Sequence, residues 1–315
     1  MREYGYGVDI GGTFTKFGRM DRQGNLLEKW SLPTDTSDGG RHLIASVGGS
    51  LRENLRKNGL SSEDLFGVGL GVPAPVDRDG WVVGGENTGW GHRRVDAAGE
   101  LSDLLGVPVR AVNDGNAAAL GEMWRGAGRG CPNLVMLTVG TALGGGVIVN
   151  GTIVTGCHGA GGEIGSMMMR PYEPEIAVDG KGGCLEQYVS ATGLVRSAGK
   201  CLAADGRPSV LRAAAQLDAK AILDAAAGGD AIASEVLTDF ADLLGQACAC
   251  VSSVIDPELY LIGGGVSSAG ELLLEPVRRA FHRYAYFVFG DTRFAIAALG
   301  NDAGIYGSCR LVLPE

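Results

Sequence analysis

Two stretches of the chain share one pattern, and this pattern limits the possible folds more than any other feature. Residues 4–31 contain an apolar strand, a break at Gly11-Gly12-Thr13, a second strand, a turn and a third strand. Residues 133–154 follow the same plan, with a glycine break at 140–146 and a turn at Asn150-Gly151. Asn-Gly between two apolar runs is a strong hairpin signal. A glycine-broken hairpin at the start of each half predicts a duplicated domain, and two copies so far apart argue against a solenoid.

The rest of the chain alternates between expected helices and expected strands. Helices are predicted over 41–57, 96–105, 116–124 and 230–254, and from Glu271 and Asp302; strands are predicted over 65–72, 107–112, 259–265 and 293–299. This alternation predicts an α/β fold, here with two domains around a cleft. We place residues 1–114 and 300–315 in a small N-terminal domain and residues 115–299 in a large C-terminal domain.

Composition narrows the classes of function. The 315 residues include 53 glycines, in short clusters beside apolar runs and without a collagen-like period. We interpret these clusters as tight turns and as places where backbone approaches a ligand. A net charge of -9 argues against nucleic acid or a membrane surface as a partner. Scattered cysteines, no long apolar run and no signal peptide predict a cytoplasmic protein with reduced thiols.

The first candidate site is the segment Asp9-Ile10-Gly11-Gly12-Thr13. Glycines let backbone N–H groups face phosphate oxygens, and a carboxylate at the strand end can hold Mg²⁺, directly or through water. The lysine of a P-loop is absent from this segment, so it is a different kind of phosphate-binding turn. A plain hairpin turn is the alternative interpretation.

Two further glycine segments fit a nucleotide. The segment 140–146, with Thr141, stands at the matching place in the second half and predicts a second phosphate turn. Gly263-Gly264-Gly265 follows a buried strand and precedes a helix. Three glycines there would let a flat base or a ribose lie against the backbone, although a tight strand-to-helix connection would use the same residues.

Asp114 is the candidate catalytic base. It lies in Asn113-Asp114-Gly115-Asn116, between an expected strand and an expected helix. A carboxylate at such a junction can orient a substrate hydroxyl and accept its proton during phosphoryl transfer. The alternative is structural, because Asp and Asn are preferred N-caps and either Asp114 or Asn116 could be capping the helix.

Two glutamates are candidates for binding a polyol. Glu163 lies in a glycine-rich segment, and Glu186 follows Cys184 and Leu185. Carboxylates accept hydrogen bonds from pairs of hydroxyl groups, whereas the default interpretation of each residue is a solvated loop position.

Together these motifs resemble the ROK family of bacterial sugar kinases, within the actin-like (ribonuclease H-like) ATPase superfamily. The resemblance covers nearly the whole chain. It is carried by DIGGT (9–13), GVPAPVD (71–77), NTGW (87–90), VNDGNAAALGE (112–122), GTALGGG (140–146), GAGGEIG (159–165), CLEQYVS (184–190), IGGGVSSAG (262–270) and LGNDAGIYG (299–307).

The resemblance implies an enzyme that phosphorylates a hydroxyl of a sugar or sugar-like polyol with Mg-ATP, and that forms a homodimer. It implies Asp114 as base and the substrate-binding residues Asn87, Asn113, Asp114, Glu163, Ser166 and Glu186. It implies ATP-binding residues Asp9, Gly11, Gly12, Thr13, Lys16, Thr141, Gly263, Gly264 and Gly265, with Asp9 also at the Mg²⁺.

The sequence departs from the family pattern at two places. Ser166 stands where family glucokinases have a histidine that contacts both the sugar and a structural zinc ion. Of the expected zinc ligands over 177–184, only Cys184 is present, and one thiol cannot build a tetrahedral site, so no structural zinc is predicted. His158 in the preceding loop is expected to be a solvated residue, with a contact to the sugar as the alternative. The substrate is therefore left open among glucose, another hexose, an amino sugar and a cyclitol.

Two other classes of protein share this fold. A sugar-binding regulator without kinase activity would carry a DNA-binding domain before the first phosphate turn, whereas eight residues precede Asp9. A chaperone-like or filament-like ATPase would not need Glu163 and Glu186. Because function is argued from the site, we expect a carbohydrate kinase.

Overall fold

The computed structural model describes residues 2–176, 180 and 182–314 of the chain. The first sheet has the order β3-β2-β1-β4-β7. Strands β1 to β3 form an antiparallel meander, and β4 and β7 continue the sheet in parallel with β1. The strands are β1 (Tyr4–Ile10), β2 (Phe14–Asp21), β3 (Leu26–Pro33), β4 (Leu65–Val72) and β7 (Val109–Asn113).

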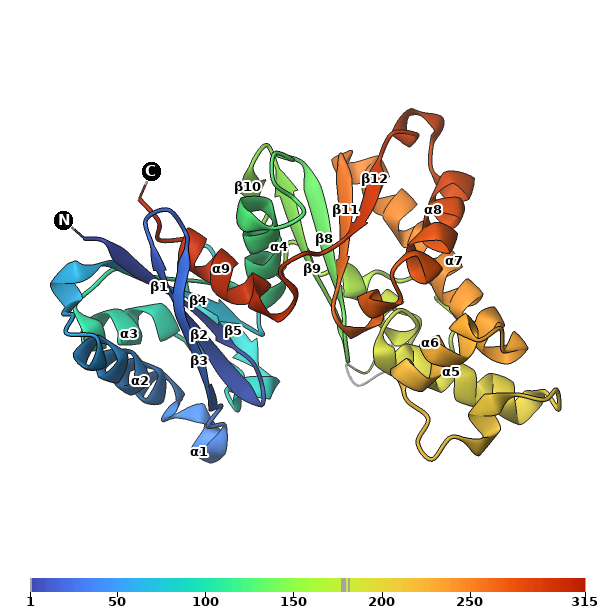
Figure 1. The fold of residues 1–315 in the computed structure, drawn as a ribbon, viewed down its shortest axis with the longest axis horizontal. Helices are drawn as coiled ribbons and strands as arrows, with labels where there is room; N and C mark the ends of the chain where they lie inside the picture. The colour runs from blue at the N-terminus through green and yellow to red at the C-terminus, as the bar shows by residue number, and fades with distance from the viewer. Residues whose placement is uncertain (1, 177–179, 181, 315) are drawn as a thin grey trace. The chain divides into compact units, whose positions relative to one another are not determined.

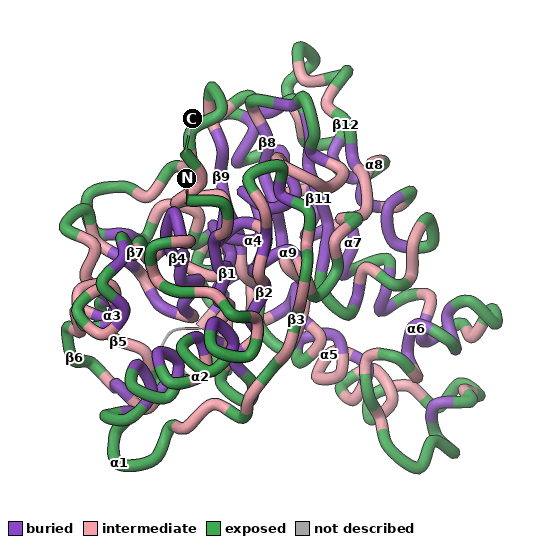
Figure 2. The backbone as a smooth tube through the Cα atoms, turned by 60° about the vertical axis from the view of Figure 1, so that its left-hand side comes forward, coloured by how far each residue is buried: buried purple, intermediate pink, exposed green. Residues whose placement is uncertain are grey.

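The second sheet repeats this plan with the order β10-β9-β8-β11-β12. An antiparallel hairpin, β9 and β10, forms one side, and β8, β11 and β12 run parallel. The strands are β8 (Leu134–Val139), β9 (Leu143–Val149), β10 (Thr152–Ile153), β11 (Leu259–Gly263) and β12 (Arg293–Ile296). The duplication predicted from the two hairpins is confirmed, and Figure 2 shows the central strands of both sheets as mostly buried.

Within the described residues, all the predicted helices are present, together with three α-helices for which no range was predicted. In the first half they are α1 (Ser37–Gly40), α2 (Leu43–Lys57), α3 (Ala97–Leu105) and α4 (Asp114–Arg125). In the second half they are α5 (Ala191–Ala204), α6 (Ala219–Ala227), α7 (Ala231–Ile255), α8 (Glu271–Tyr284) and α9 (Ala303–Arg310). The chain forms two compact units, one of residues 1–132, 146–162 and 298–315, the other of residues 133–145 and 163–297. The domain boundary near Asp114 stays a prediction.

Several details differ from the sequence prediction. Helix α4 begins at Asp114 rather than at Asn116. Strand β9 begins at Leu143, so Gly144 to Gly146 lie inside a strand and only residues 140–142 form the turn. The hairpin of β5 (Val82–Gly85) and β6 (Gly91–Val95) was not predicted, because its strands are short and β6 has the polar sequence GHRRV.

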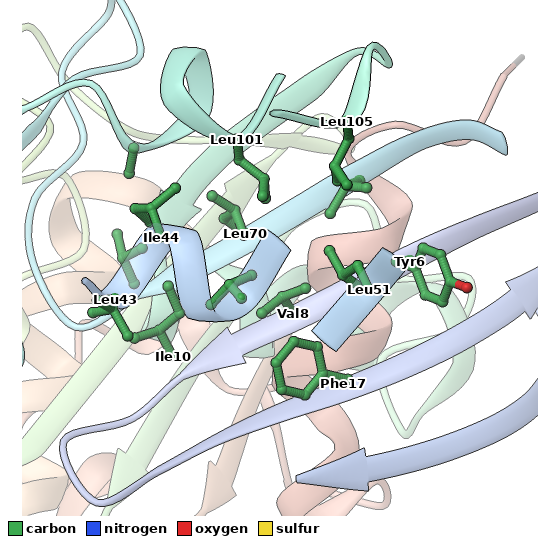
Figure 3. Close-up of a cluster of buried hydrophobic side chains, with 14 of the residues drawn as sticks. Tyr6, Val8, Ile10, Phe17, Leu43, Ile44, Leu51, Leu70, Leu101 and Leu105 are labelled. Carbon is green, nitrogen blue, oxygen red and sulfur yellow. The ribbon is translucent and has the colours of Figure 1, made fainter. Parts of the chain in front are cut away.

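Helices α2 and α3 cover one face of the first sheet (Figure 1). Leu43, Val47 and Leu51 of α2 recur at intervals of four residues, which places them on one side of the helix. They pack with Leu70 of β4 and Leu101 of α3 in the buried cluster of Figure 3. Burial of each such leucine contributes about 1.5–3 kcal/mol, so this cluster anchors the sheet that carries the first half of the candidate site.

Helix α9 covers the other face of this sheet (Figure 1). A Cβ on Gly7 of β1 would lie 1.8 Å from the carbonyl oxygen of Ile305, and one on Gly69 of β4 would lie 1.7 Å from that of Ser308. Part of the glycine excess thus serves close packing of a helix on the sheet, a use that was not predicted from the sequence. Within the described residues, no helix has both the length and the apolar character of a membrane span.

Candidate active site

The first candidate turn places Asp9 beside Lys16. Residues Asp9 and Lys16 are partners in the antiparallel register of β1 and β2, and Lys16 Nζ lies 3.3 Å from Asp9 Oδ2. Burial raises the pKa of Asp9, and the charge of Lys16 opposes this rise. A Cβ on Gly304 would lie 2.7 Å from Asp9 Cγ, so a glycine at the start of α9 leaves room for the carboxylate. Gly304 lies in the motif LGNDAGIYG (299–307), but no role was predicted for it.

Asn87 lies next to the same turn. It belongs to a short 3₁₀ helix (Glu86–Thr88) and is exposed. A Cβ on Gly12 would approach the carbonyl oxygen of Asn87 to 3.2 Å. Trp90 is buried and donates a hydrogen bond from Nε1 to the carbonyl of Gly40 at 3.1 Å, which fixes this segment against the end of α1. The structure therefore brings together Gly12 and Asn87, which lie far apart in the sequence.

Asp114 lies at the carboxyl edge of the first sheet. Asn113 ends β7, pairs with Val72 of β4 and is the N-cap of α4. Its Oδ1 accepts a hydrogen bond from the backbone N–H of Asn116 at 3.1 Å, so the cap is neither Asp114 nor Asn116. Asp114 is half-buried, and its Oδ1 accepts a hydrogen bond from the N–H of Gly115 at 2.8 Å. Ligands of open α/β sheets bind at this edge, which is where a catalytic base is needed.

Glu122, two turns further along α4, is fully buried. Its carboxylate accepts hydrogen bonds from the backbone N–H groups of Ala127 at 2.8 Å, Ala298 at 3.1 Å and Leu299 at 2.7 Å. It thereby ties the helix that begins with Asp114 to the segment that leads into α9 and Gly304. The sequence signal was a single carboxylate at the end of an alanine-rich helical run, and it was not interpreted.

In the second unit, the turn at 140–142 and the glycine triplet lie side by side. Gly264 has φ of 82°, and a Cβ there would lie 2.4 Å from the carbonyl oxygen of Val139. The start of α5 holds the turn: Ala191 N–H donates to the carbonyl of Gly140 at 2.7 Å, and Thr192 Oγ1 donates to that of Thr141 at 2.9 Å. Thr141, Gly264 and Gly265 are exposed at this place.

Glu163 and Glu186 are also brought together within this unit. Glu163 precedes the 3₁₀ helix η3 (Ile164–Ser166), and Glu186 lies in the 3₁₀ helix η4 (Leu185–Gln187). Glu186 Oε2 accepts a hydrogen bond from the N–H of Leu143 at 2.8 Å. Loss of surrounding water first, and the negative charge of Glu186 second, raise the pKa of Glu163. Two adjacent carboxylates that repel each other form a site that would gain from hydroxyl donors.

Of the two metals considered above, magnesium is the one for which the described residues include a suitable ligand. A magnesium ion takes hard oxygen ligands and often only one or two carboxylates, since phosphate oxygens and water complete its shell. Asp9 meets this requirement. For zinc, the described part of the chain holds no group of three or more His, Cys, Asp or Glu able to bind a metal. Of the residues at the expected zinc ligands, 177–179 and 181 lie outside the described residues, and the absence of zinc stays a prediction.

The chain is similar in sequence and in structure to known sugar kinases. The model of the ROK family matches residues 5–315. A glucokinase of Halalkalibacterium halodurans is 39% identical over 97% of this chain and 94% of its own, and one of Thermotoga maritima is 34% identical over 97% and 96%. The crystal structure of a ROK family glucokinase from Streptomyces griseus, in complex with glucose and AMPPNP, has a TM-score of 0.79 and 31% identity, with 98% of each chain covered.

The duplicated actin-like fold and these matches define a carbohydrate kinase, an enzyme that phosphorylates a hydroxyl of a sugar or sugar-like polyol with ATP. The chain belongs to the ROK family, as its motifs predict.

Proposed function

We propose that this kinase phosphorylates a hexose, with glucose as the preferred substrate, and that Asp114 is its catalytic base. The observation that carries the proposal is the N-terminus of α4, where Asn113 rather than Asp114 accepts the capping hydrogen bond. Because Asp114 lies in the first turn of α4 and is not its cap, its carboxylate is a candidate for the catalytic base. The glucokinases of similar sequence support glucose as the acceptor.

Asp114 would accept a hydrogen bond from the acceptor hydroxyl and then its proton. The hydroxyl oxygen forms a bond to the γ-phosphorus of ATP while the bond from that phosphorus to the β–γ bridging oxygen breaks, and ADP leaves. Such positioned bases contribute roughly 10²- to 10⁴-fold to the rate. Because phosphoryl transfer depends mainly on alignment and on charge stabilisation, the base works together with the groups that hold both substrates.

The sugar would be held by Asn87, Asn113, Glu163, Ser166 and Glu186. Since Oδ1 of Asn113 is used by the helix cap, its sugar contact would come from Nδ2, which has a long 3.5 Å contact to the carbonyl of Ala74. Glu186 is oriented through Oε2, and its Oε1 would accept a sugar hydroxyl. Hydroxyl donors would relieve the repulsion that raises the pKa of Glu163.

The nucleotide would be held by the two glycine turns and the glycine triplet. Backbone N–H groups at Gly11, Gly12 and Thr13, together with Thr141, would face phosphate oxygens. Gly263, Gly264 and Gly265 would lie along the ribose or base. Asp9, with Lys16 beside it, would hold Mg²⁺, which neutralises charge on the phosphates when bound. We further propose a cytoplasmic homodimer with no nucleic-acid or membrane partner.

An acceptor screen tests the proposed function. ATP consumption is measured with hexoses, hexosamines, N-acetylhexosamines and cyclitols, and the phosphorylated position of each product is assigned by NMR. We expect the highest kcat/KM with glucose. Turnover by another acceptor at a higher kcat/KM would overturn the choice of glucose, and no stimulated turnover with any of them would overturn the kinase itself.

A further inference from the structure

Tyr188, two residues after Glu186, lies under two guanidinium groups. The Cζ atom of Arg170 is 4.7 Å from the centroid of the Tyr188 ring, and that of Arg196 is 5.0 Å from it. The Tyr188 hydroxyl donates a hydrogen bond to the Glu173 carboxylate. Tyr188 is only 8% exposed, and cations over a ring that is shielded from water bind it more strongly than at the surface. The proposed role of Glu186 does not use this cluster.

A second carboxylate connects the cluster to α5. Glu175 Oε2 lies 3.0 Å from Arg196 Nη1 and also pairs with Lys200, one turn further along the helix. The Arg196 side chain is 18% exposed and that of Glu175 is 44% exposed, so water screens the guanidinium less than the carboxylate. The residues Arg170, Glu173, Glu175, Tyr188 and Arg196 are called the charge–aromatic clasp below.

Hydrogen bonds connect both neighbours of Glu186 to the segment that carries the clasp carboxylates. The N–H of Leu185 donates to the carbonyl of Met167 at 2.8 Å. On the other side, Gln187 accepts a hydrogen bond from Gly183 N–H at 2.6 Å and donates from Nε2 to the carbonyl of Glu175 at 2.7 Å. Residues 167–176 and 182–184, called the hairpin below, carry Arg170, Glu173 and Glu175. The orientation of Glu186 is therefore set by its two neighbours, which are both fixed to this hairpin.

The same hairpin follows directly after η3 (Ile164–Ser166), and η3 follows Glu163. Met168 and Cys184 form an antiparallel bridge between its two sides. A Cβ on Gly165 would lie 2.5 Å from the carbonyl of Leu143 and 3.4 Å from Glu186 Cβ, so η3 and η4 are in close contact. A movement of the hairpin relative to α5 would shift both sugar-binding carboxylates.

The pKa shifts of Glu173 and Tyr188 keep both groups, at neutral pH, in the protonation states that their hydrogen bond needs. The hydrogen bond from Tyr188 is the largest cause that lowers the pKa of Glu173. Burial, and then the hydrogen bond to Glu173, raise the pKa of Tyr188 to about 12. Glu173 is thus an anion and Tyr188 a neutral donor, which is the arrangement that the hydrogen bond needs.

We infer that the charge–aromatic clasp positions Glu186 and Glu163 for the sugar by holding the hairpin formed by residues 167–176 and 182–184 against α5. This inference rests on the proposed function only in that these two carboxylates bind the sugar. The clasp residues are positioning residues, because they act on the substrate through Glu186 and Glu163.

Three variants test the clasp. Tyr188→Phe keeps the ring and removes the hydrogen bond to Glu173, Glu175→Gln keeps the shape and removes the charge, and Arg196→Met removes the guanidinium. We expect each to raise the KM for glucose roughly fivefold or more, with the KM for ATP and kcat within about twofold of wild type. Arg196→Lys should restore part of the affinity for glucose, because it keeps a cation near Glu175.

The matched control is Lys220→Met, which breaks the exposed pair of Lys220 and Asp224 on α6 in the same unit. Its KM for glucose should equal that of wild type. Glu175→Gln combined with Arg196→Met should raise the KM less than the product of the single effects, since the two residues share one interaction.

The outcomes separate this inference from the proposed function. If Glu186→Gln leaves the KM for glucose unchanged, the sugar-binding role of Glu186 is wrong. If Glu186→Gln raises this KM but folded Tyr188→Phe and Glu175→Gln behave like Lys220→Met, or change only the thermal midpoint, the clasp is overturned. Tyr188→Phe and Glu175→Gln are near-isosteric, so they decide the question even if Arg196→Met does not fold.

Discussion

The side chain of Asn113 caps helix α4 by accepting a hydrogen bond from the backbone N–H of Asn116 at 3.1 Å. Three polar residues at this junction therefore have different environments: Asn113 is the cap, Asn116 is almost fully buried, and Asp114 is half-buried in the first turn. The structural alternative to a catalytic Asp114 was that it caps the helix. The hydrogen bond of Asn113 shows that Asp114 is not the N-cap, although Asp114 Oδ1 accepts a hydrogen bond from the N–H of Gly115.

Asn113→Ala is expected to destabilise the fold by about 1 kcal/mol, because the N–H of Asn116 loses its acceptor. Urea unfolding followed by circular dichroism measures this change. The same variant should raise the KM for glucose if Nδ2 of Asn113 contacts the sugar. Equal stability of the variant and the wild type would show that another group caps α4.

Glu122→Ala is expected to destabilise the fold by about 3 kcal/mol or more, because three backbone N–H donors lose a buried acceptor. The control is Glu258→Ala, which removes an exposed carboxylate that accepts a hydrogen bond from Asn133. That variant should lose no more than about 0.5 kcal/mol. Similar unfolding curves for the two variants would contradict the structural role of Glu122.

Glu163→Gln is expected to stabilise the free protein at neutral pH while it weakens sugar binding. The pKa of Glu163 is raised in the fold, so its contribution to stability is present below the ordinary glutamate pKa of about 4.3 and is lost as the pH rises through the raised value. The amide carries no charge at any pH. The variant should therefore have the higher thermal midpoint at pH 7 and 8, and the difference should disappear near pH 4.

Thermal unfolding at several pH values in the absence of sugar measures this effect. Glu175→Gln serves as a comparison, because the pKa of Glu175 is lowered, first by the hydrogen bond from Lys200. Its effect on the thermal midpoint should have the opposite sign at neutral pH. A constant difference between Glu163→Gln and wild type from pH 4 to 8 would contradict the raised pKa.

The sequence predicted the parts of the fold that depend on local chemistry. The Asn150-Gly151 turn, the continuous apolar run of β4 and the start of α8 at Glu271 all lie where they were expected. The duplicated order of the two sheets followed from the two hairpins. These features depend on periodicity and turn preference, which are properties of short segments.

Contacts between distant segments could not be predicted in this way. The packing of Gly7 and Gly69 depends on α9, whose Ile305 and Ser308 they contact and which lies at the far end of the chain. The choice of Asn113 over Asp114 and Asn116 as cap depends on where β7 ends, which single-sequence patterns place only within a few residues. The sequence around Glu122 does not indicate its hydrogen-bond partners. All three are backbone N–H groups, and two of them lie beyond residue 297.

The role of Asp114 is the central claim, and Asp114→Asn tests it most directly. The carboxamide keeps the size of the side chain and the first turn of α4 but cannot accept a full proton from the hydroxyl. Asp218→Asn is the control, since it changes a helix-capping aspartate at the start of α6. The measurement is kcat for ATP-dependent phosphorylation of the acceptor with the highest kcat/KM. We predict a decrease of about 100-fold or more for folded Asp114→Asn and wild-type turnover for Asp218→Asn; near-normal turnover of Asp114→Asn would contradict the account.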